Sequence, residues 1–141
     1  MGGKGGDMGD LVSEAVVQSV RRDIRAAFDR YEAALVGNDV AALIGFFRPD
    51  AQAIRMMTGS GLYGIDEIAA FRKTRDATDM ARDLLRVEIR VLSAEIAVAT
   101  AEYRRKASGL KGAQTQIWQL GPDGWRIACA HVSLEAQTGL A

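Results

Sequence analysis

The chain has 141 residues, of which 48% are hydrophobic and 26% are charged, a composition typical of a globular protein that buries a substantial core. Lys plus Arg and Asp plus Glu each number 18, so the formal net charge is zero and no overall field attracts nucleic acid or an anionic membrane. The single cysteine, Cys129, excludes an internal disulfide, and no apolar run reaches the roughly 20 residues of a membrane span, so we expect a cytoplasmic protein.

The chain is predicted to begin with a tail and a long helix. Residues 1–10 are expected to form a flexible glycine-rich tail that lacks the apolar segment of a signal peptide. Residues 11–141 are expected to form a single domain. A helix is predicted over residues 11–36, because apolar side chains recur there at helical spacing. These side chains are Val17, Val20, Ile24, Ala27, Phe28, Tyr31 and Leu35.

Three shorter elements are predicted next. They are a helix from Asn38 or Asp39 to residues 46–47, a strand over residues 52–57 and a third helix over residues 65–77. Asn38 and Asp39 suit a helix N-cap, and Pro49 ends the short helix. A glycine-bearing loop, residues 58–61, follows the strand.

The C-terminal half is predicted to be all strand. The expected strands cover residues 84–92, 96–105, 114–120 and 125–134, and the first of them alternates apolar with charged side chains, as a half-buried strand does. Helices early and strands late indicate an α+β fold, in which helices cover one face of a curved antiparallel sheet. We expect the helices and the concave face to enclose a pocket.

Two arginines of the third helix are candidates for that pocket. Arg72 and Arg75 project to the middle of the helix's apolar face, and a buried guanidinium without a partner is strongly destabilising, so each must find an anion. One interpretation is an ion pair with Glu102, Asp76 or Asp79, or a side chain that reaches solvent. The other is a pocket that binds a carboxylate.

Tyr31 and Arg55 form a second candidate pair. Tyr31 lies on the apolar face of the first helix and needs a hydrogen-bond partner if it is buried. Arg55 lies in the first predicted strand. Together they could clamp an anion and supply a proton donor, although the pattern alone favours an ordinary core tyrosine and an exposed arginine.

Cys129 and His131 are two residues apart in the last strand, so they are predicted to share a face with Trp125, Ile127 and Ser133. A Cys–His nucleophilic pair is conceivable, and a packed cysteine beside a hydrogen-bonded histidine is the simpler interpretation. One histidine and one cysteine cannot form the usual zinc sites. The glycines near residue 60 lack the Gly-Lys-Ser/Thr of a phosphate loop.

The chain resembles the AtzH-like proteins, which include the HpxZ-type oxalurate catabolism proteins, over about residues 20–135. The nuclear transport factor 2-like superfamily contains them, together with SnoaL-like and ketosteroid-isomerase-like proteins. The matching segments include Arg30-Tyr31-Glu32, Leu62-Tyr63-Gly64, Phe71-Arg72-Lys73-Thr74-Arg75, Gly124-Trp125-Arg126 and Ala130-His131-Val132-Ser133. The resemblance implies a cone-shaped α+β fold with a pocket at its wide end. It also implies a homodimer or a higher homo-oligomer.

The resemblance also implies an activity, the decarboxylating hydrolysis of 1,3-dicarboxyurea to allophanate without a metal or an organic cofactor. The family's functional tyrosine and arginine fall on Tyr31 and Arg55, which we therefore expect to be catalytic. Arg72, Arg75, Gln116 and His131 are expected to complete the site of a small anionic substrate. The predicted function is a cofactor-free decarboxylating amidohydrolase that acts on a small carboxylated urea or amide.

Two alternatives stay open. The family commonly has Gly, Glu and Arg where this chain has Met57, Ser60 and Ala113. These departures favour a non-catalytic dimeric protein that binds a small ligand or assists an amidase of ureide or purine catabolism. An isomerase or cyclase for an apolar ligand would need an acid on the pocket floor, and Glu102 is the candidate. No nucleic-acid or membrane partner is predicted.

Overall fold

The computed structural model describes residues 12–136, so the predicted tail over residues 1–10 lies outside the described residues. Three helices precede or interrupt the strands: α1 (Glu14–Val36), α2 (Val40–Gly45) and α3 (Ile65–Thr74). The strands are β1 (Ile54–Met57), β2 (Ser60–Tyr63), β3 (Arg82–Ser93), β4 (Ile96–Arg105), β5 (Lys111–Gly121) and β6 (Gly124–Leu134). The predicted α+β class is confirmed.

Local chemistry explains the helix limits. Ser13 caps α1 by accepting a hydrogen bond from the Val16 amide, and Asp39 caps α2 by accepting one from the Ala42 amide, as N-cap side chains do. Helix α3 ends at Thr74, three residues earlier than predicted, because Arg75 has an extended backbone. This early end matters for the site, because the Arg75 side chain no longer points in the direction that a continued helix would give it.

The sheet has six strands in the order β2-β1-β6-β5-β4-β3. All neighbours are antiparallel except β1 and β6, which are parallel, so the sheet is mixed and the predicted antiparallel pattern is wrong at this one pair. Strand β2 lies partly in the region predicted as a loop. It pairs with β1 through a turn that needs a positive φ at Gly59, 84°, which glycine adopts without steric cost.

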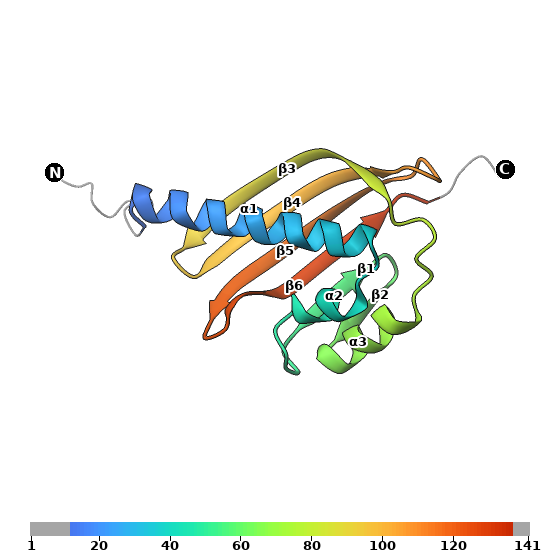
Figure 1. The fold of residues 1–141 in the computed structure, drawn as a ribbon, viewed down its shortest axis with the longest axis horizontal. Coiled ribbons are helices and arrows are strands. Elements are labelled where there is room, and N and C mark those ends of the chain that lie inside the picture. Colours follow the sequence, from blue (N-terminus) through green and yellow to red (C-terminus); the bar gives the residue numbers. More distant parts are fainter. Residues whose placement is uncertain (1–11, 137–141) are drawn as a thin grey trace.

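The helices lie on one face of the sheet. Figure 1 shows α1 crossing the long strands, with α2 and α3 grouped beside β1 and β2. The core fills the space between α1 and the sheet, and its largest fully buried side chains include Trp118, Tyr103, Phe28, Phe47 and Ile24. Ala97, Ala99 and Ala101 are buried on the same face of β4, and their small side chains let α1 approach the strand closely.

A β-bulge corrects one prediction. Ile117 pairs with Cys129 and Trp118 pairs with Ile127, so Ala128 is an extra residue in β6. A bulge breaks the alternation of side chains. Ile127 therefore faces the core with Trp118, while Cys129 and His131 lie on the opposite face of the sheet. Cys129 and His131 therefore share a face as predicted, whereas the prediction that Ile127 shares it with them is wrong.

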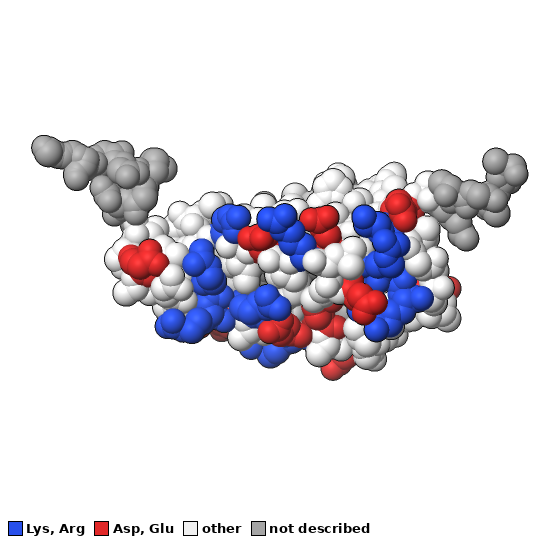
Figure 2. All heavy atoms as spheres, turned by 90° about the horizontal axis from the view of Figure 1, so that it is seen from above, with Lys and Arg blue, Asp and Glu red and all other residues white. Residues whose placement is uncertain are grey.

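The surface does not gather charge of one sign. Figure 2 shows basic and acidic side chains interspersed over the face seen from above, as the equal numbers of the two signs lead one to expect. Among residues 12–136, no helix is long and apolar enough to cross a membrane.

Candidate anion-binding site

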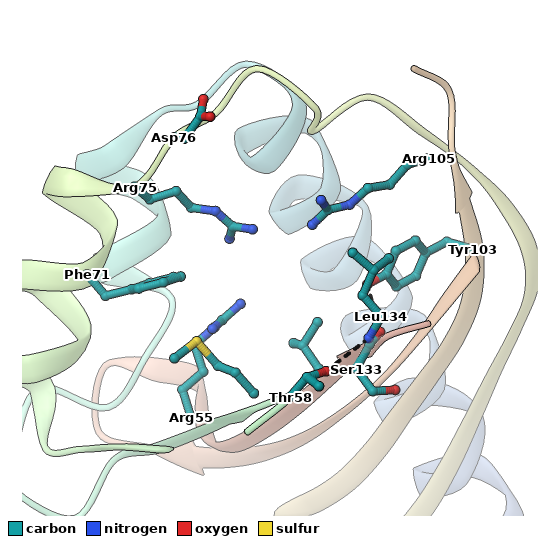
Figure 3. Close-up of a pocket in the computed structure, with 11 residues that line it drawn as sticks. Arg55, Thr58, Phe71, Arg75, Asp76, Tyr103, Arg105, Ser133 and Leu134 are labelled. Atoms are coloured by element: carbon teal, nitrogen blue, oxygen red, sulfur yellow. Dashed lines mark hydrogen bonds between the residues drawn. The ribbon is translucent and has the colours of Figure 1, made fainter. Parts of the chain in front are cut away.

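A cavity of about 320 Å³ opens between α3, the end of β1 and the ends of β4 and β6. Figure 3 shows Arg75 and Arg105 extending toward each other from opposite walls, with Arg55 entering from a third side. The lining residues include Arg55, Met57, Phe71, Arg75, Tyr103 and Arg105. A narrow inner recess continues from this cavity and is lined in addition by Tyr31, Arg72, Arg82 and Gln114.

Arg55 is held inside the protein by its strand. It pairs with Ala130 in the parallel β1–β6 ladder, and both residues face the core, so only 3% of Arg55 is exposed. The guanidinium carbon lies 4.7 Å from the centre of the Phe71 ring. Nε and Nη1 have no hydrogen-bond partner among the described residues. Burial first, and the positive charge of Arg72 second, lower the pKa of Arg55 to about 10.

Arg72 joins Tyr31 to the same cluster. It lies one helical turn after the buried Ile68 in α3, so it faces the interior as predicted, and 2% of it is exposed. Arg72 Nη2 donates a hydrogen bond to Tyr31 Oη at 2.5 Å. Nε and Nη1 are buried without a partner in the described part of the chain. The prediction paired Tyr31 with Arg55, and the structure gives Tyr31 a hydrogen bond with Arg72 instead, while Tyr31 and Arg55 both line the recess.

Arg75 is the third cation of the cluster and is partly exposed. Burial, and then the charges of Arg72 and Arg105, lower its pKa to about 10. The guanidinium carbons of Arg72 and Arg75 lie 5.7 Å and 5.1 Å from the Phe71 ring centre. The ring of Phe71 thus contacts three guanidiniums, and its π face partly offsets their desolvation.

The other two arginines of the cavity have acidic partners. Arg82 forms an ion pair with Glu32, and Arg105 Nη1 lies 3.6 Å from Asp79 Oδ2. By contrast, Arg55, Arg72 and Arg75 form no ion pair within residues 12–136. The cavity is consequently positive, although the chain as a whole is neutral.

The predicted acidic partners of Arg72 and Arg75 are not in place. Asp79 pairs with Arg105, and the Asp76 carboxylate points away from the space between the guanidiniums in Figure 3. Glu102 is exposed, and it lies on the face of β4 opposite the buried Ala101 and Tyr103. This placement also removes Glu102 as the acid of an isomerase site.

The structure places two predicted substrate contacts, His131 and Gln116, outside the lining of the cavity and the recess. His131 is exposed on the sheet face that points away from the cavity, because the bulge resets the alternation of β6. Gln116 is buried, but its Oε1 accepts a hydrogen bond from Trp118 Nε1 at 3.0 Å, and it lines neither the cavity nor the recess. Gln114, two residues earlier on the same face of β5, lines the recess instead.

The sequence contained a signal for the contacts that it missed. Side chains alternate along a strand, so Gln114 shares a face with Gln116 and Trp118, and Tyr103 shares one with Ala101. All five of these side chains are buried. Of the family departures, Met57 lines the cavity, whereas Ser60 and Ala113 do not.

The unpaired polar atoms of the recess are nearly all donors, since arginine and the amide nitrogen of glutamine cannot accept a hydrogen bond. Such a site suits an acceptor-rich anion, above all a carboxylate, which arginine binds through two parallel hydrogen bonds. The same positive charge opposes a metal ion. No group of three or more acidic, histidine or cysteine side chains within residues 12–136 is placed to hold one.

Comparisons with known proteins place the chain among relatives of similar size. The AtzH-like family model matches residues 14–138. A protein of unknown function of the DUF3225 family from Pectobacterium atrosepticum is 43% identical, with a TM-score of 0.79 over 88% of this chain and 94% of that protein. A cystatin-like fold protein from Burkholderia xenovorans is 34% identical, with a TM-score of 0.76 over 83% and 92% of the two chains.

More distant structures share only the fold. A nuclear transport factor 2-like superfamily protein from Salmonella enterica is 23% identical, with a TM-score of 0.69 over 88% of this chain and 96% of that one. The fold is therefore nuclear transport factor 2-like. A comparison with functionally curated proteins found no matching sequence.

Proposed function

This chain belongs to the AtzH-like family, and we propose that its cavity binds a small carboxylated urea or amide and promotes the loss of CO2 from it. The observation that carries the proposal is the burial of Arg55 and Arg72, 3% and 2% exposed, without an acidic partner in the described residues. A buried unpaired charge is strongly destabilising, so a bound anion would offset a cost that the protein bears when it is empty.

The number of cations supports a ligand with more than one negative charge. Arg55, Arg72 and Arg75 all surround Phe71 and lack an ion pair within residues 12–136. One carboxylate would leave two positive charges in the cluster, whereas a small molecule with two carboxylates would leave one. The volume of about 320 Å³ restricts the ligand to a compact compound.

The chemical step needs a proton at the right atom. In an N-carboxylated urea, the bond between the nitrogen and the carboxyl carbon breaks, the electron pair stays on nitrogen and CO2 leaves. We assign the proton that the nitrogen then takes up to the Tyr31 hydroxyl. Arg72, which donates to Tyr31 Oη, would stabilise the resulting phenolate until water returns the proton. Arg55 would orient the carboxylate that remains.

Turnover tests this assignment. Purified protein mixed with 1,3-dicarboxyurea should release CO2 and form allophanate faster than buffer alone. Tyr31→Phe and Arg55→Ala should each abolish the release while the circular dichroism spectrum stays native. Full activity in either variant would remove that residue from the mechanism.

A non-catalytic binding protein is the second candidate, and one observation favours it. Among the described residues that line the cavity and the recess, the only acid is Asp76, which lies at the mouth and accepts a hydrogen bond from the Thr78 amide. His131 lies on the other face of the sheet. A site without a general base beside its buried arginines binds anions without activating water. We propose in that case that the protein is a homo-oligomer that delivers its ligand to an amidase.

The two candidates differ in a measurable way. Binding of carboxylated ureas without turnover, together with co-elution of an amidase from the native source, would favour the accessory role. Light scattering of the purified protein would show whether it is the expected dimer or a higher oligomer, and a monomer would contradict the oligomeric proposal.

A further inference from the structure

We propose that Gln114 is a specificity-determining contact of this cavity, whose amide nitrogen donates a hydrogen bond to the innermost oxygen of the ligand. This inference rests on the proposed anion-binding function and deepens it. It assigns a role to a residue that neither the sequence pattern nor the family resemblance had selected. It also predicts which chemical group the recess accepts.

The position of Gln114 follows from its strand. It pairs with Ala101 on β4 and with Val132 on β6, and it is 4% exposed on the concave face. Its side chain lines the recess together with Tyr31, Arg55 and Arg72. The residue thus lies at the inner end of the cavity, among side chains that are almost fully buried.

The orientation of the amide is set by Arg82. Arg82 Nη2 donates to Gln114 Oε1 at 2.9 Å, and since a guanidinium only donates, the amide oxygen must face it. Arg82 is itself fixed, because its Nε donates to Glu32 at 3.0 Å and its guanidinium lies 4.1 Å from the Tyr103 ring centre. The Glu32–Arg82 pair therefore holds the amide oxygen of Gln114 on the side of Arg82. Gln114 Nε2 consequently points away from Arg82.

The turned nitrogen has nothing to bind in the described protein. Gln114 Nε2 is buried without a hydrogen-bond partner, in a protein whose buried polar groups should be almost all paired. The same recess holds unpaired donor atoms of Arg55 and Arg72. All three side chains therefore offer N–H groups, and the ligand group that satisfies them is one that only accepts, a carboxylate.

This arrangement predicts discrimination between a carboxylate and its amide. A carboxamide carries two N–H donors of its own, and one of them would face Gln114 or an arginine, leaving buried donors opposed to each other. A site built to hydrogen-bond one group rejects the analogue that cannot do so. We therefore expect oxalurate to bind and oxaluramide, its uncharged amide, to bind at least tenfold more weakly.

The Gln114→Glu variant distinguishes a direct contact with the ligand from a purely structural role of Gln114. The new carboxylate keeps an acceptor for Arg82, so a purely structural role would be preserved. It removes the Nε2 donor and places a negative charge beside the bound anion, so the affinity for oxalurate should fall at least tenfold. The melting temperature without ligand should rise, because the carboxylate compensates buried arginines.

Gln119→Glu is the matched control. Gln119 lies on the same strand and its Oε1 also accepts from an arginine, Arg48 Nη1, at 3.1 Å, but it is exposed and outside the cavity. Gln114→Met tests the loss of hydrogen bonding without added charge. Calorimetric titration with oxalurate should show wild-type affinity in Gln119→Glu and at least tenfold weaker binding in both Gln114 variants.

The outcomes distinguish a failure of the role of Gln114 from a failure of the anion-binding function. Unchanged affinity in Gln114→Glu, or equal weakening in Gln119→Glu, would overturn the role of Gln114 while the wild type still binds. Absence of binding in the wild type and in the control alike would overturn the anion-binding function itself, and the inference with it.

Discussion

Arg55 combines two properties that conflict in a stable protein, since it is charged and it is almost fully buried. Its Nε and Nη1 lack a hydrogen-bond partner in the described residues, and the contact with Phe71 offsets only part of the desolvation. A residue that lowers the stability of the folded protein in this way is typical of a functional site, where a bound ligand offsets the destabilisation.

Replacing this charge should therefore stabilise the empty protein. Arg55→Met keeps most of the side-chain volume and removes the buried cation, so the free energy of unfolding in urea should rise by about 1–3 kcal/mol. Oxalurate should no longer stabilise the variant. A loss of stability in Arg55→Met with an intact ligand response would show that Arg55 has a structural role.

The lowered pKa values of Arg55 and Arg75, both about 10, predict an alkaline limit to binding. Below this pH both guanidiniums are protonated, so they should not make affinity vary between pH 7 and 9. Above it the folded protein releases protons that the unfolded chain still holds, so these two groups make stability rise with pH, while affinity for an anion falls. Titrations from pH 7 to 11 should show the fall, and constant affinity to pH 11 would contradict it.

Sequence reasoning found the arginines and the tyrosine because chemistry makes them conspicuous on an apolar face. Arg72 could be placed from helical spacing alone, since Ile68 and Arg72 share one side of α3. His131 and Gln116 were misplaced because a strand pattern shows which residues share a face but not which face meets the cavity. A single extra residue, Ala128, was enough to reverse the phase of β6.

At the scale of elements, the close contact of β4 and β5 shapes one wall of the cavity. Gly112 lies opposite Tyr103, and a methyl group there would lie 2.7 Å from the carbonyl oxygen of Ser133 and closer still to the Tyr103 ring. Tyr103 in turn lies against Arg82 and donates its hydroxyl to Ser133 O at 3.2 Å. Only glycine leaves room for this arrangement.

Gly112→Ala should therefore displace Tyr103 and weaken both the fold and the site. We expect a loss of about 1–3 kcal/mol in the free energy of unfolding and a lower affinity for oxalurate. Gly45→Ala, at the end of α2 with no atom within 4 Å of the added methyl group, is the control and should be neutral or stabilising by up to about 1 kcal/mol. Equal effects of the two changes would contradict the role given to Gly112.

The helices and strands were largely predictable from the sequence, whereas the pairing of the strands was not. Periodicity gave three helices and the four long strands, with β4 correct at both ends. Strand β2 was missed because Gly59 and Gly61 make a short run that looks like a loop. The parallel pairing of β1 with β6 joins residues more than 70 positions apart, and local pattern carries no information on such a pair.

At the scale of the whole molecule, the charges are balanced but unevenly placed. The surface in Figure 2 mixes basic and acidic side chains, and the sequence contains 18 basic and 18 acidic residues. The cavity nevertheless holds three arginines without an ion pair within residues 12–136. A neutral exterior with a positive interior favours a small anion over an anionic polymer or membrane.

Ligand binding in this cavity should raise the free energy of unfolding of the whole domain. A ligand at about 100 times its dissociation constant adds roughly 2.7 kcal/mol, so oxalurate, which carries one carboxylate, or a small dicarboxylate should raise the melting temperature clearly. Neutral ureas at the same concentration should not. A shift of equal size with neutral compounds would indicate binding by shape alone.

Calorimetric titration of oxalurate into the wild type and into Arg55→Ala near neutral pH tests the central claim most directly. The arginine cavity predicts saturable binding of one molecule per chain in the wild type, and at least tenfold weaker binding in a variant that remains folded. No saturable binding, or equal affinity in the two proteins, would show that the buried guanidiniums do not hold an anion.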